Sequence, residues 1–263
     1  MKISVVTVCY NSVDTIEETM LSVLNQTYPN VEYIIIDGGS TDGTVEIIKK
    51  YANRLSYWVS EPDNGIYDAM NKGIAVATGD YINFMNSGDR FYNEKVVSDV
   101  FQIKNITDNE IIYGDAIYEY RKFTLLFKPQ PLELFDSYFP IYHQATFSKT
   151  LLMKENKFNL TYRCSADYDF LFKMYKKQYK FIYTPLIFCR FEAERGLSST
   201  NIELQLKETG EINGLINSDQ YRKMIKKTLI KLRLKLFFSK FIPGISSHLR
   251  KKSLLRNNYI FEV

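Results

Sequence analysis

Apolar runs alternate with helix-like patterns along the first hundred residues of the chain. Residues 2–9 contain the run ISVVTVC and residues 31–37 read VEYIIID, and both are rich in Val and Ile. Such runs are typical of strands buried on both faces of a parallel sheet. The pattern also predicts strands at residues 55–59 and 81–85, and helices from near Ile16 and over residues 42–51 and 66–77. Because strands and helices alternate, we expect a doubly wound α/β sheet.

The pattern is less regular from residue 110 to residue 190. It predicts strands at residues 111–113 and 181–187, a hairpin at 116–127 and a helix at 166–177. Residues 192–200 (EAERGLSST) are typical of a polar loop. No internal repeat is present.

Polar side chains follow each of the first four predicted strands. Tyr10 and Asn11 follow the first, Asp37 ends the second, and residues 61–63 and 86–89 follow the third and fourth. In open α/β sheets, ligands bind at the carboxyl ends of the strands, so these positions predict a binding site. The chain has no GxGxxG after the first strand and no GxxxxGK[ST], which argues against standard dinucleotide and P-loop sites.

Composition narrows the class of protein. With 45% apolar and 24% charged residues over 263 positions, the chain can bury a core. It lacks a run of 18 apolar residues, and its N-terminal apolar run is short, so neither a membrane-spanning helix nor a secretory signal is expected. Cys9, Cys164 and Cys189 are odd in number and widely spaced. This spacing argues against a disulfide framework or a cysteine zinc site and fits a reducing cytoplasm.

The charge of the chain is unevenly distributed. Residues 220–263 contain 12 Lys/Arg and one acid, whereas residues 1–219 contain 22 basic and 29 acidic residues. Within residues 221–252, an apolar stripe and a row of lysines follow helical spacing. This basic amphipathic helix is predicted to bind an anionic membrane surface, with packing on the acidic body or a homo-oligomer contact as alternatives. No nucleic-acid recognition module is present.

Four motifs occur in an order that resembles family 2 glycosyltransferases. They are VVTVCYN, SVLNQTYPNVEYIIIDGGSTDGT, EPDNGIYDAMNKGIAVATGDYINFMNSGD and SADYDF, and together they cover about residues 1–190. The resemblance implies a GT-A fold and inverting sugar transfer from a nucleoside-diphosphate sugar. It also implies a catalytic domain at 1–200, with nucleotide-binding (1–100) and acceptor-binding (101–200) halves. Residues 201–263 are then a basic amphipathic helical tail.

The resemblance also implies a metal site after the fourth strand. The family pattern there is an acidic DxD-like motif, and this chain reads Asn86-Ser87-Gly88-Asp89. Asp89 is the carboxylate that remains, and it is implied to hold Mn²⁺ or Mg²⁺ against the donor diphosphate. Hard divalent ions take oxygen ligands, including carboxylates, phosphates and waters. The alternative is a turn aspartate without a ligand.

The resemblance places the donor nucleotide near the first strand ends. The implied nucleotide-sugar-binding residues are Val8, Tyr10, Asn11, Asp37, Asp68, Asn71, Lys72, Ser87, Gly88 and Asp89. The chain departs from the family at Gly38, where a second acid is frequent, and at Met70, where an arginine is frequent. Asp37 could contact the base or ribose or only close a turn, and Asp42 is expected to cap the following helix.

Three further roles are implied on the acceptor side. Asp167 in Ala166-Asp167 is the expected general base, although an acid at a helix N-terminus is also favoured by the helix dipole. His143 and Gln144 are expected near the acceptor, with a structural histidine as the alternative. Arg195 is expected in a loop near the donor, where it could neutralise the leaving diphosphate. The alternative is a solvated loop without a role in binding.

The expected function is therefore an inverting, metal-dependent glycosyltransferase of bacterial surface polysaccharide assembly, such as capsule or O-antigen. The acceptor would be a glycan or a polyprenyl-linked glycan, and the protein would lie on the cytoplasmic face of the cell membrane. The alternative is a non-catalytic sugar-nucleotide binder or membrane-associated scaffold, motivated by the departures from the family pattern at Gly38, Met70, Gly88 and Ala166.

Overall fold

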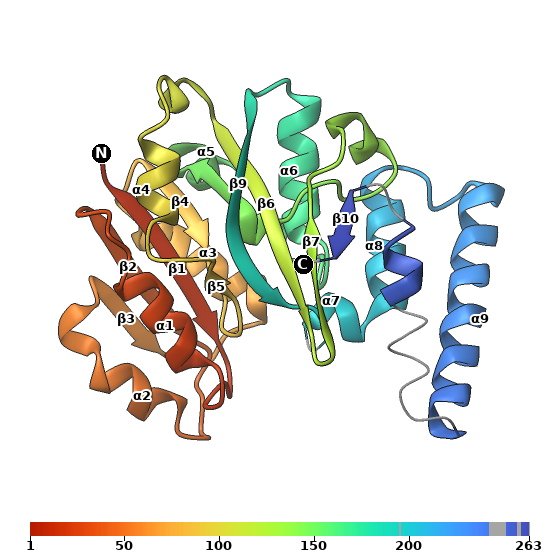
Figure 1. Ribbon diagram of the computed structural model, residues 1–263, viewed down its shortest axis with the longest axis horizontal. Coiled ribbons are helices and arrows are strands. Elements are labelled where there is room, and N and C mark those ends of the chain that lie inside the picture. The colour runs from red at the N-terminus through yellow and green to blue at the C-terminus, as the bar shows by residue number, and fades with distance from the viewer. Residues whose placement is uncertain (195, 242–250, 257–258, 263) are drawn as a thin grey trace.

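A single mixed sheet with helices on both faces dominates the structure, a computed structural model that describes residues 1–194, 196–241, 251–256 and 259–262 (Figure 1). Its strands are β1 (Ile3–Cys9), β2 (Val31–Asp37), β3 (Tyr57–Ser60), β4 (Tyr81–Phe84), β5 (Arg90–Phe91), β6 (Ile111–Tyr120), β7 (Phe123–Phe127), β8 (Thr146–Lys149), β9 (Phe181–Glu192) and β10 (Ile260–Glu262). Its helices are α1 (Ile16–Leu24), α2 (Thr44–Lys50), α3 (Ile66–Val76), α4 (Val96–Phe101), α5 (Thr150–Glu155), α6 (Ala166–Lys176), α7 (Leu197–Thr200), α8 (Ile202–Ile212) and α9 (Asp219–Phe241).

The strand order is β10-β7-β6-β8-β4-β1-β2-β3, and β9 pairs with β5 and β6. The strands β3, β2, β1 and β4 are parallel, as the alternation of strands and helices predicts. Beyond β4 the sheet becomes mixed, because β8 runs antiparallel to both β4 and β6, while β9 runs parallel to β6. The carboxyl ends of β1, β2 and β4 therefore meet at one edge.

Two hydrophobic cores lie on opposite faces of the sheet. Alternate residues of β1 point into them: Val6 and Val8 pack with α3, whereas Val5 and Cys9 pack with α1. The first core also contains α5 and α6, and the second contains α2 and α4. At Gly73 a Cβ atom would stand 2.5 Å from a methyl group of Val6, so glycine is what lets α3 approach β1 this closely. The parallel strands are thus buried on both faces, as expected.

The predicted strands and helices of the first half are confirmed with small shifts at their ends. The third strand begins two residues late, at Tyr57, because Ala52–Arg54 forms a 3-10 turn that delays it. The N-cap of α2 is Gly43, and not Asp42 as the sequence predicted. The Asp42 carboxylate instead accepts hydrogen bonds from the backbone N–H groups of Thr44 and Val13 and so holds the turn before the helix. All three cysteines are buried and free.

Two predictions about the second half were wrong in extent. The strand expected at residues 111–113 continues to Tyr120 and forms the predicted hairpin with β7, pairing Ala116 with Phe127. The last predicted strand continues five residues beyond residue 187, because Phe188 and Cys189 are fully buried against β6. A short helix, α7, then occupies part of the region expected to be a polar loop.

The residues after 200 contact the sheet domain at several points. The buried carboxylate of Glu208, on α8, accepts hydrogen bonds from the backbone N–H groups of Arg163 and Cys164 at 2.7 and 2.8 Å. The strand β10 pairs antiparallel with β7 of the sheet. Within the residues after 200, Tyr221 of α9 donates its hydroxyl to the Leu206 carbonyl of α8 at 2.8 Å. The domain boundary at residue 200 stays a prediction.

The long helix α9 lies at the opposite end of the molecule from α2 (Figure 1). None of the helices in the described part of the chain is long and apolar enough to cross a membrane. Pro243 and Gly244, which the sequence predicts to end this helix, lie outside the described residues.

Candidate active site

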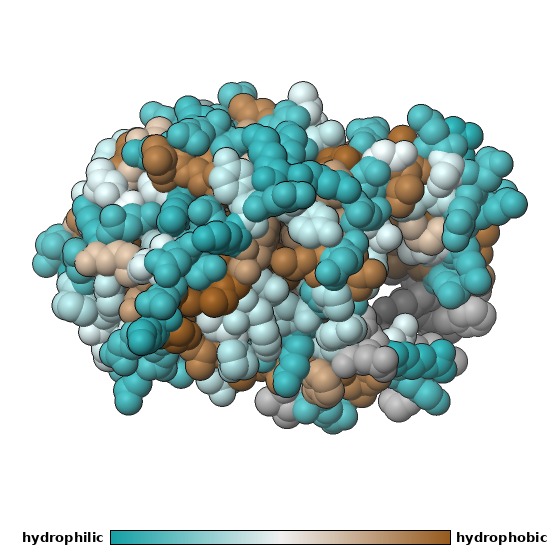
Figure 2. All heavy atoms as spheres, turned by 90° about the horizontal axis from the view of Figure 1, so that it is seen from above, coloured by the Kyte–Doolittle hydropathy of each residue, from teal (hydrophilic) through white to brown (hydrophobic). Residues whose placement is uncertain are grey.

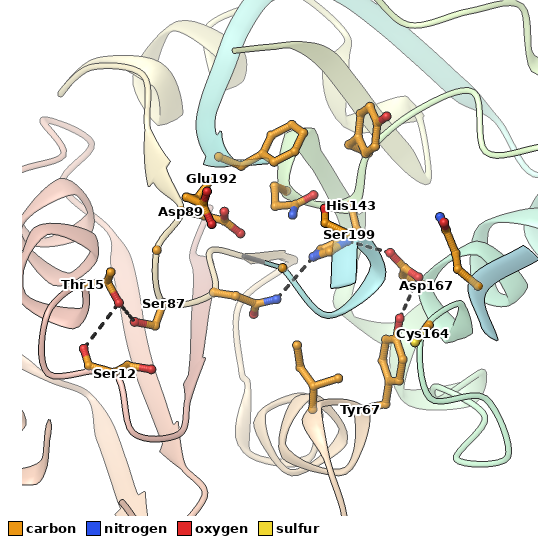
Figure 3. A pocket seen from close by; sticks show the side chains of 18 of the residues that line it. Ser12, Thr15, Tyr67, Ser87, Asp89, His143, Cys164, Asp167, Glu192 and Ser199 are labelled. Carbon is orange, nitrogen blue, oxygen red and sulfur yellow. Dashed lines mark hydrogen bonds and ion pairs between the residues drawn. The ribbon is translucent and has the colours of Figure 1, made fainter. Parts of the chain in front are cut away.

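A cavity of about 520 Å³ opens at the carboxyl ends of β1 and β4 and reaches the start of α6 (Figure 3). Its walls come from segments far apart in the sequence. They include residues 11–15 before α1, residues 86–89 after β4, residues 142–144 and 164–168, Glu192 at the end of β9, and Gln205 and Thr209 of α8. The predicted site residues Asn11, Ser87, Gly88, Asp89, His143, Gln144 and Asp167 all line this one cavity.

Asp167 is held by two hydrogen bonds at the N-terminus of α6. The hydroxyl of Tyr67 donates to Oδ1 at 2.8 Å, and Nδ1 of His143 lies 2.8 Å from Oδ2 (Figure 3). Burial raises the pKa of Asp167, but the contacts with His143 and Tyr67 outweigh it, and the pKa lies below its usual value. Asp167 is therefore an ionised, oriented carboxylate in the cavity wall. Asp169 instead pairs with Lys173 at 2.5 Å.

His143 connects the two sides of the cavity. Because Nδ1 faces an ionised carboxylate, we assign the ring proton to Nδ1, which leaves Nε2 as an acceptor. Nε2 lies 3.4 Å from Nδ2 of Asn86, in the loop after β4. The histidine thus joins the end of β4 to the start of α6 and orients Asp167.

Asp89 lies in the turn after β4 and is buried in the opposite part of the cavity. Gly88 has φ +97°, a left-handed conformation that favours glycine, and Thr19 secures the turn by bonding to the backbone of both Gly88 and Asp89. Burial raises the pKa of Asp89 to about 7, although the nearby His143 ring and hydrogen bonds from the Gln144 side chain and the Glu192 backbone N–H lower it. A carboxylate with so raised a pKa is a candidate functional group.

The chemistry of this region fits a hard divalent cation. Oδ1 of Asn86 and Oε1 of Gln144 are buried without a hydrogen-bond partner, and both residues line the cavity together with Asp89. Amide and carboxylate oxygens are the ligands that Mg²⁺ and Mn²⁺ take in proteins. The described residues contain no group of three or more His, Cys, Asp or Glu that could hold a metal, so phosphate and water would complete the coordination.

The cavity is acidic. Its described lining includes the acids Asp14, Asp42, Asp89, Asp167 and Glu192, and neither lysine nor arginine is among these described lining residues. Arg195, expected to neutralise a diphosphate, lies outside the described residues. The acidic lining would repel an anionic ligand, and a bound cation would offset that repulsion.

Several predicted nucleotide-binding residues lie outside the cavity. Val8 is in the core, and Tyr10 is 64% exposed on the surface next to Gly38. The buried Asp37 carboxylate closes the turn after β2 by accepting from the backbone of Gly39 and Ser40 and from the Ser60 hydroxyl. Direct contact of these residues with a nucleotide stays a prediction.

The three predicted residues on or near α3 are engaged in local contacts. Asp68 accepts from the Asn64 N–H, and Asn71 exchanges two hydrogen bonds with the backbone of Phe158. Lys72 forms an ion pair with Glu61 at 2.7 Å. Their predicted roles toward the donor also stay predictions.

The missing acid at Gly38 has a structural counterpart. A Cβ atom at Gly38 would stand 2.5 Å from Oδ2 of Asp63 and 3.4 Å from the Tyr10 ring. The Asp63 carboxylate, from the loop after β3, therefore occupies the space beside Tyr10 that a side chain at position 38 would need.

Sequence reasoning missed Tyr67 and Glu192 as cavity residues. Tyr67 lies inside the helix predicted at residues 66–77, and its hydrogen bond to Asp167 spans 100 positions. Glu192 was placed in a loop because the predicted strand ended at residue 187. Reading the largely apolar segment IFCRF as a continuation of the strand would have put Glu192 at a strand end.

The comparisons with known proteins agree on one family. Residues 4–178 match the model of glycosyl transferase family 2. An uncharacterised glycosyltransferase of Mycobacterium tuberculosis is 32% identical over 188 residues, which cover 65% of this chain and 68% of that protein. The PGL/p-HBAD biosynthesis glycosyltransferase of Mycobacterium bovis is 29% identical over 197 residues, or 69% of this chain and 73% of that protein.

Solved structures share the fold. Staphylococcus aureus TarS 1–349 in complex with UDP superposes with a TM-score of 0.62 at 20% identity, over 83% of this chain and 67% of that chain. The mannosyltransferase PcManGT of Pyrobaculum calidifontis, in complex with GDP-Man and Mn²⁺, superposes with a TM-score of 0.63 at 14% identity. The match covers 98% of this chain and 81% of that chain. The curled mixed sheet is thus of the GT-A type, and the chain belongs to glycosyl transferase family 2 and is a glycosyltransferase.

Proposed function

We propose that this enzyme transfers a sugar from a nucleoside-diphosphate sugar to a hydroxyl group of a glycan or lipid-linked acceptor, with inversion and with a divalent cation. The observation that carries the proposal is that two buried acids, Asp89 and Asp167, both lie in the walls of one cavity. We further propose that the reaction belongs to the assembly of a bacterial surface polysaccharide, such as capsule or O-antigen.

The acidic lining supports a requirement for Mn²⁺ or Mg²⁺. Asp89 would hold the cation, with the unpaired amide oxygens of Asn86 and Gln144 nearby. When bound, the ion would neutralise the diphosphate and stabilise it as a leaving group. Related folds support a nucleotide-sugar donor without selecting one base, since TarS is described with UDP-GlcNAc and PcManGT with GDP-Man and Mn²⁺.

Asp167 is the proposed general base. The acceptor hydroxyl gives its proton to the Asp167 carboxylate as its oxygen attacks the anomeric carbon from the face opposite the leaving diphosphate. The new C–O bond forms as the bond to the diphosphate breaks, which inverts the anomeric centre. Tyr67 and His143 keep the carboxylate ionised and oriented, so its lone pairs are positioned before the acceptor binds.

A donor panel tests the proposal. Thermal stability is measured with UDP-, GDP-, dTDP- and CMP-sugars, each with Mn²⁺ and with a chelator. We expect one nucleotide class to raise the melting temperature only with Mn²⁺, because the acidic cavity excludes the free anion. Stabilisation that persists in chelator would contradict metal dependence, and donor binding without transfer to any acceptor in a broad panel would favour a non-catalytic sugar-nucleotide binder.

We also propose that α9 rests on the cytoplasmic face of an anionic membrane, where a polyprenyl-linked acceptor would be presented. One face of this helix carries Lys223, Lys227 and Lys231 together with Ile230 and Leu234, which are 48% and 52% exposed. Figure 2 shows hydrophilic residues along the end of the molecule where α9 lies in Figure 1. A helix face that exposes both basic and apolar side chains is typical of a helix that binds at a membrane interface.

Removing the exposed lysines should weaken membrane binding. The triple change Lys223→Gln, Lys227→Gln and Lys231→Gln is expected to lower affinity for phosphatidylglycerol vesicles about tenfold or more, since each lysine contributes up to about 1 kcal/mol. Co-sedimentation measures this. The matched control removes Arg222, Lys226 and Arg233, which line a groove facing Lys207 of α8. Equal loss in both variants, or no binding by the wild type, would refute the assignment to this face.

A further inference from the structure

We propose that Glu192, the last residue of β9, supplies a second carboxylate to the divalent cation at Asp89, with the amide oxygen of Asn86 as a further ligand. The inference rests on the proposed metal dependence and deepens it. It would mean that β9 provides the acidic ligand that residues 86–88 lack.

Glu192 and Asp89 are neighbours in the cavity wall. The backbone N–H of Glu192 donates a hydrogen bond to the Asp89 carboxylate, and both residues line the same cavity. Figure 3 shows their two side chains next to each other at one end of the site. Burial is the main cause of the raised pKa of Asp89, and the charge of Glu192 raises it further, which places the two acids within electrostatic reach.

Asn86 gives an independent reason to expect a cation here. The residue is 8% exposed and lines the cavity, and its amide nitrogen faces Nε2 of His143 at 3.4 Å. Its Oδ1 is buried and has no hydrogen-bond partner. A buried acceptor without a partner costs about 1–3 kcal/mol, and coordination of a cation would offset that cost.

The charge balance favours two carboxylates over one. A single Asp89 leaves a divalent ion with net positive charge, whereas Asp89 and Glu192 together neutralise it before the diphosphate arrives. The number of charged ligands tunes the affinity of oxygen sites for divalent cations. The long strand β9, paired with β5 and β6, holds Glu192 at a fixed position relative to the turn after β4.

Mn²⁺ binding tests the inference without relying on turnover. The electron paramagnetic resonance signal of free Mn²⁺ is titrated with protein in the presence of UDP. Glu192→Gln is expected to raise the Mn²⁺ dissociation constant about tenfold or more, because it removes a charged ligand. Asn86→Asp in the Glu192→Gln background is expected to restore most of the affinity, since it returns a carboxylate to the site.

Glu194→Gln is the matched control. This residue lies two positions away, accepts the Arg121 N–H and is not among the described lining of the cavity, so Mn²⁺ affinity should stay within about twofold of wild type. If wild type binds Mn²⁺ and Glu192→Gln binds it equally well, the inference about Glu192 is wrong while the metal site stands. If wild type binds no Mn²⁺ with UDP or with any other nucleoside diphosphate, the proposed metal dependence itself fails.

Discussion

Replacing Asp167 with asparagine is expected to lower kcat by about 10²–10⁴-fold, the range that a positioned general base contributes. The donor KM should change little, because the carboxylate acts on the acceptor hydroxyl. Asparagine keeps the size of the side chain and can still accept from Tyr67 at 2.8 Å, so the fold and the cavity should survive. Steady-state kinetics with the donor class found in the panel, together with the melting temperature, measure both effects.

Asp169→Asn provides the matched control, since both acids lie in the first turn of α6. Asp169 is also buried but pairs with Lys173, so its loss should reduce stability without a large fall in kcat. An Asp167→Asn variant that retains transfer at the wild-type rate would remove Asp167 from the mechanism. A fall in kcat that merely follows a fall in the folded fraction would argue for a structural role.

Asp89→Asn is expected to abolish Mn²⁺-dependent stabilisation by the donor and to weaken donor binding about 100-fold, because the cation that offsets the diphosphate charge is lost. Burial raises the pKa of Asp89 to about 7, because burying its charged carboxylate costs free energy. The neutral amide of asparagine avoids that cost. The variant should therefore be as stable as wild type without ligand. Isothermal titration with and without Mn²⁺ checks the binding, and thermal unfolding checks the stability.

Asp14→Asn removes the same charge from the same cavity but from an exposed residue before α1. It should change Mn²⁺-dependent donor binding by less than about threefold, the effect of one solvent-exposed charge. If both variants lose binding equally, the general acidity of the cavity, and not a site at Asp89, governs the metal effect.

The parts of the site that follow local rules could be predicted from the sequence. In the parallel half, polar residues follow the buried apolar strands β1 and β4, so the clustering of Asn11 and Asp89 at one edge follows from topology. Asp167 could be placed because it opens a helix, and its role followed from the resemblance. These inferences needed no information on contacts across the chain.

What could not be predicted depends on long-range packing. The end of β9 is set by burial of Phe188 and Cys189 against β6, and that burial determines where Glu192 lies. Similarly, Glu208 holds the backbone before α6 across 44 and 45 positions, although its surrounding sequence reads as a surface helix. Charged residues are seldom buried, so sequence patterns assign them to the surface by default.

Asp63 illustrates the same limit at the nucleotide side. The absence of an acid at Gly38 counts as a loss when the sequence is read position by position. In the folded chain, the carboxylate of Asp63 stands where a side chain at Gly38 would begin. The space that a side chain at position 38 would need is thus filled by an acid that is close in space and distant in sequence.

The most direct measurement is a crystal structure of the enzyme with Mn²⁺ and the nucleoside diphosphate selected by the donor panel, using anomalous scattering to locate the metal. The account predicts an anomalous peak about 2.0–2.3 Å from an oxygen of Asp89, with the diphosphate beside it and Asp167 free to face the acceptor. A diphosphate bound in this cavity without metal, or a metal site away from Asp89, would contradict the account.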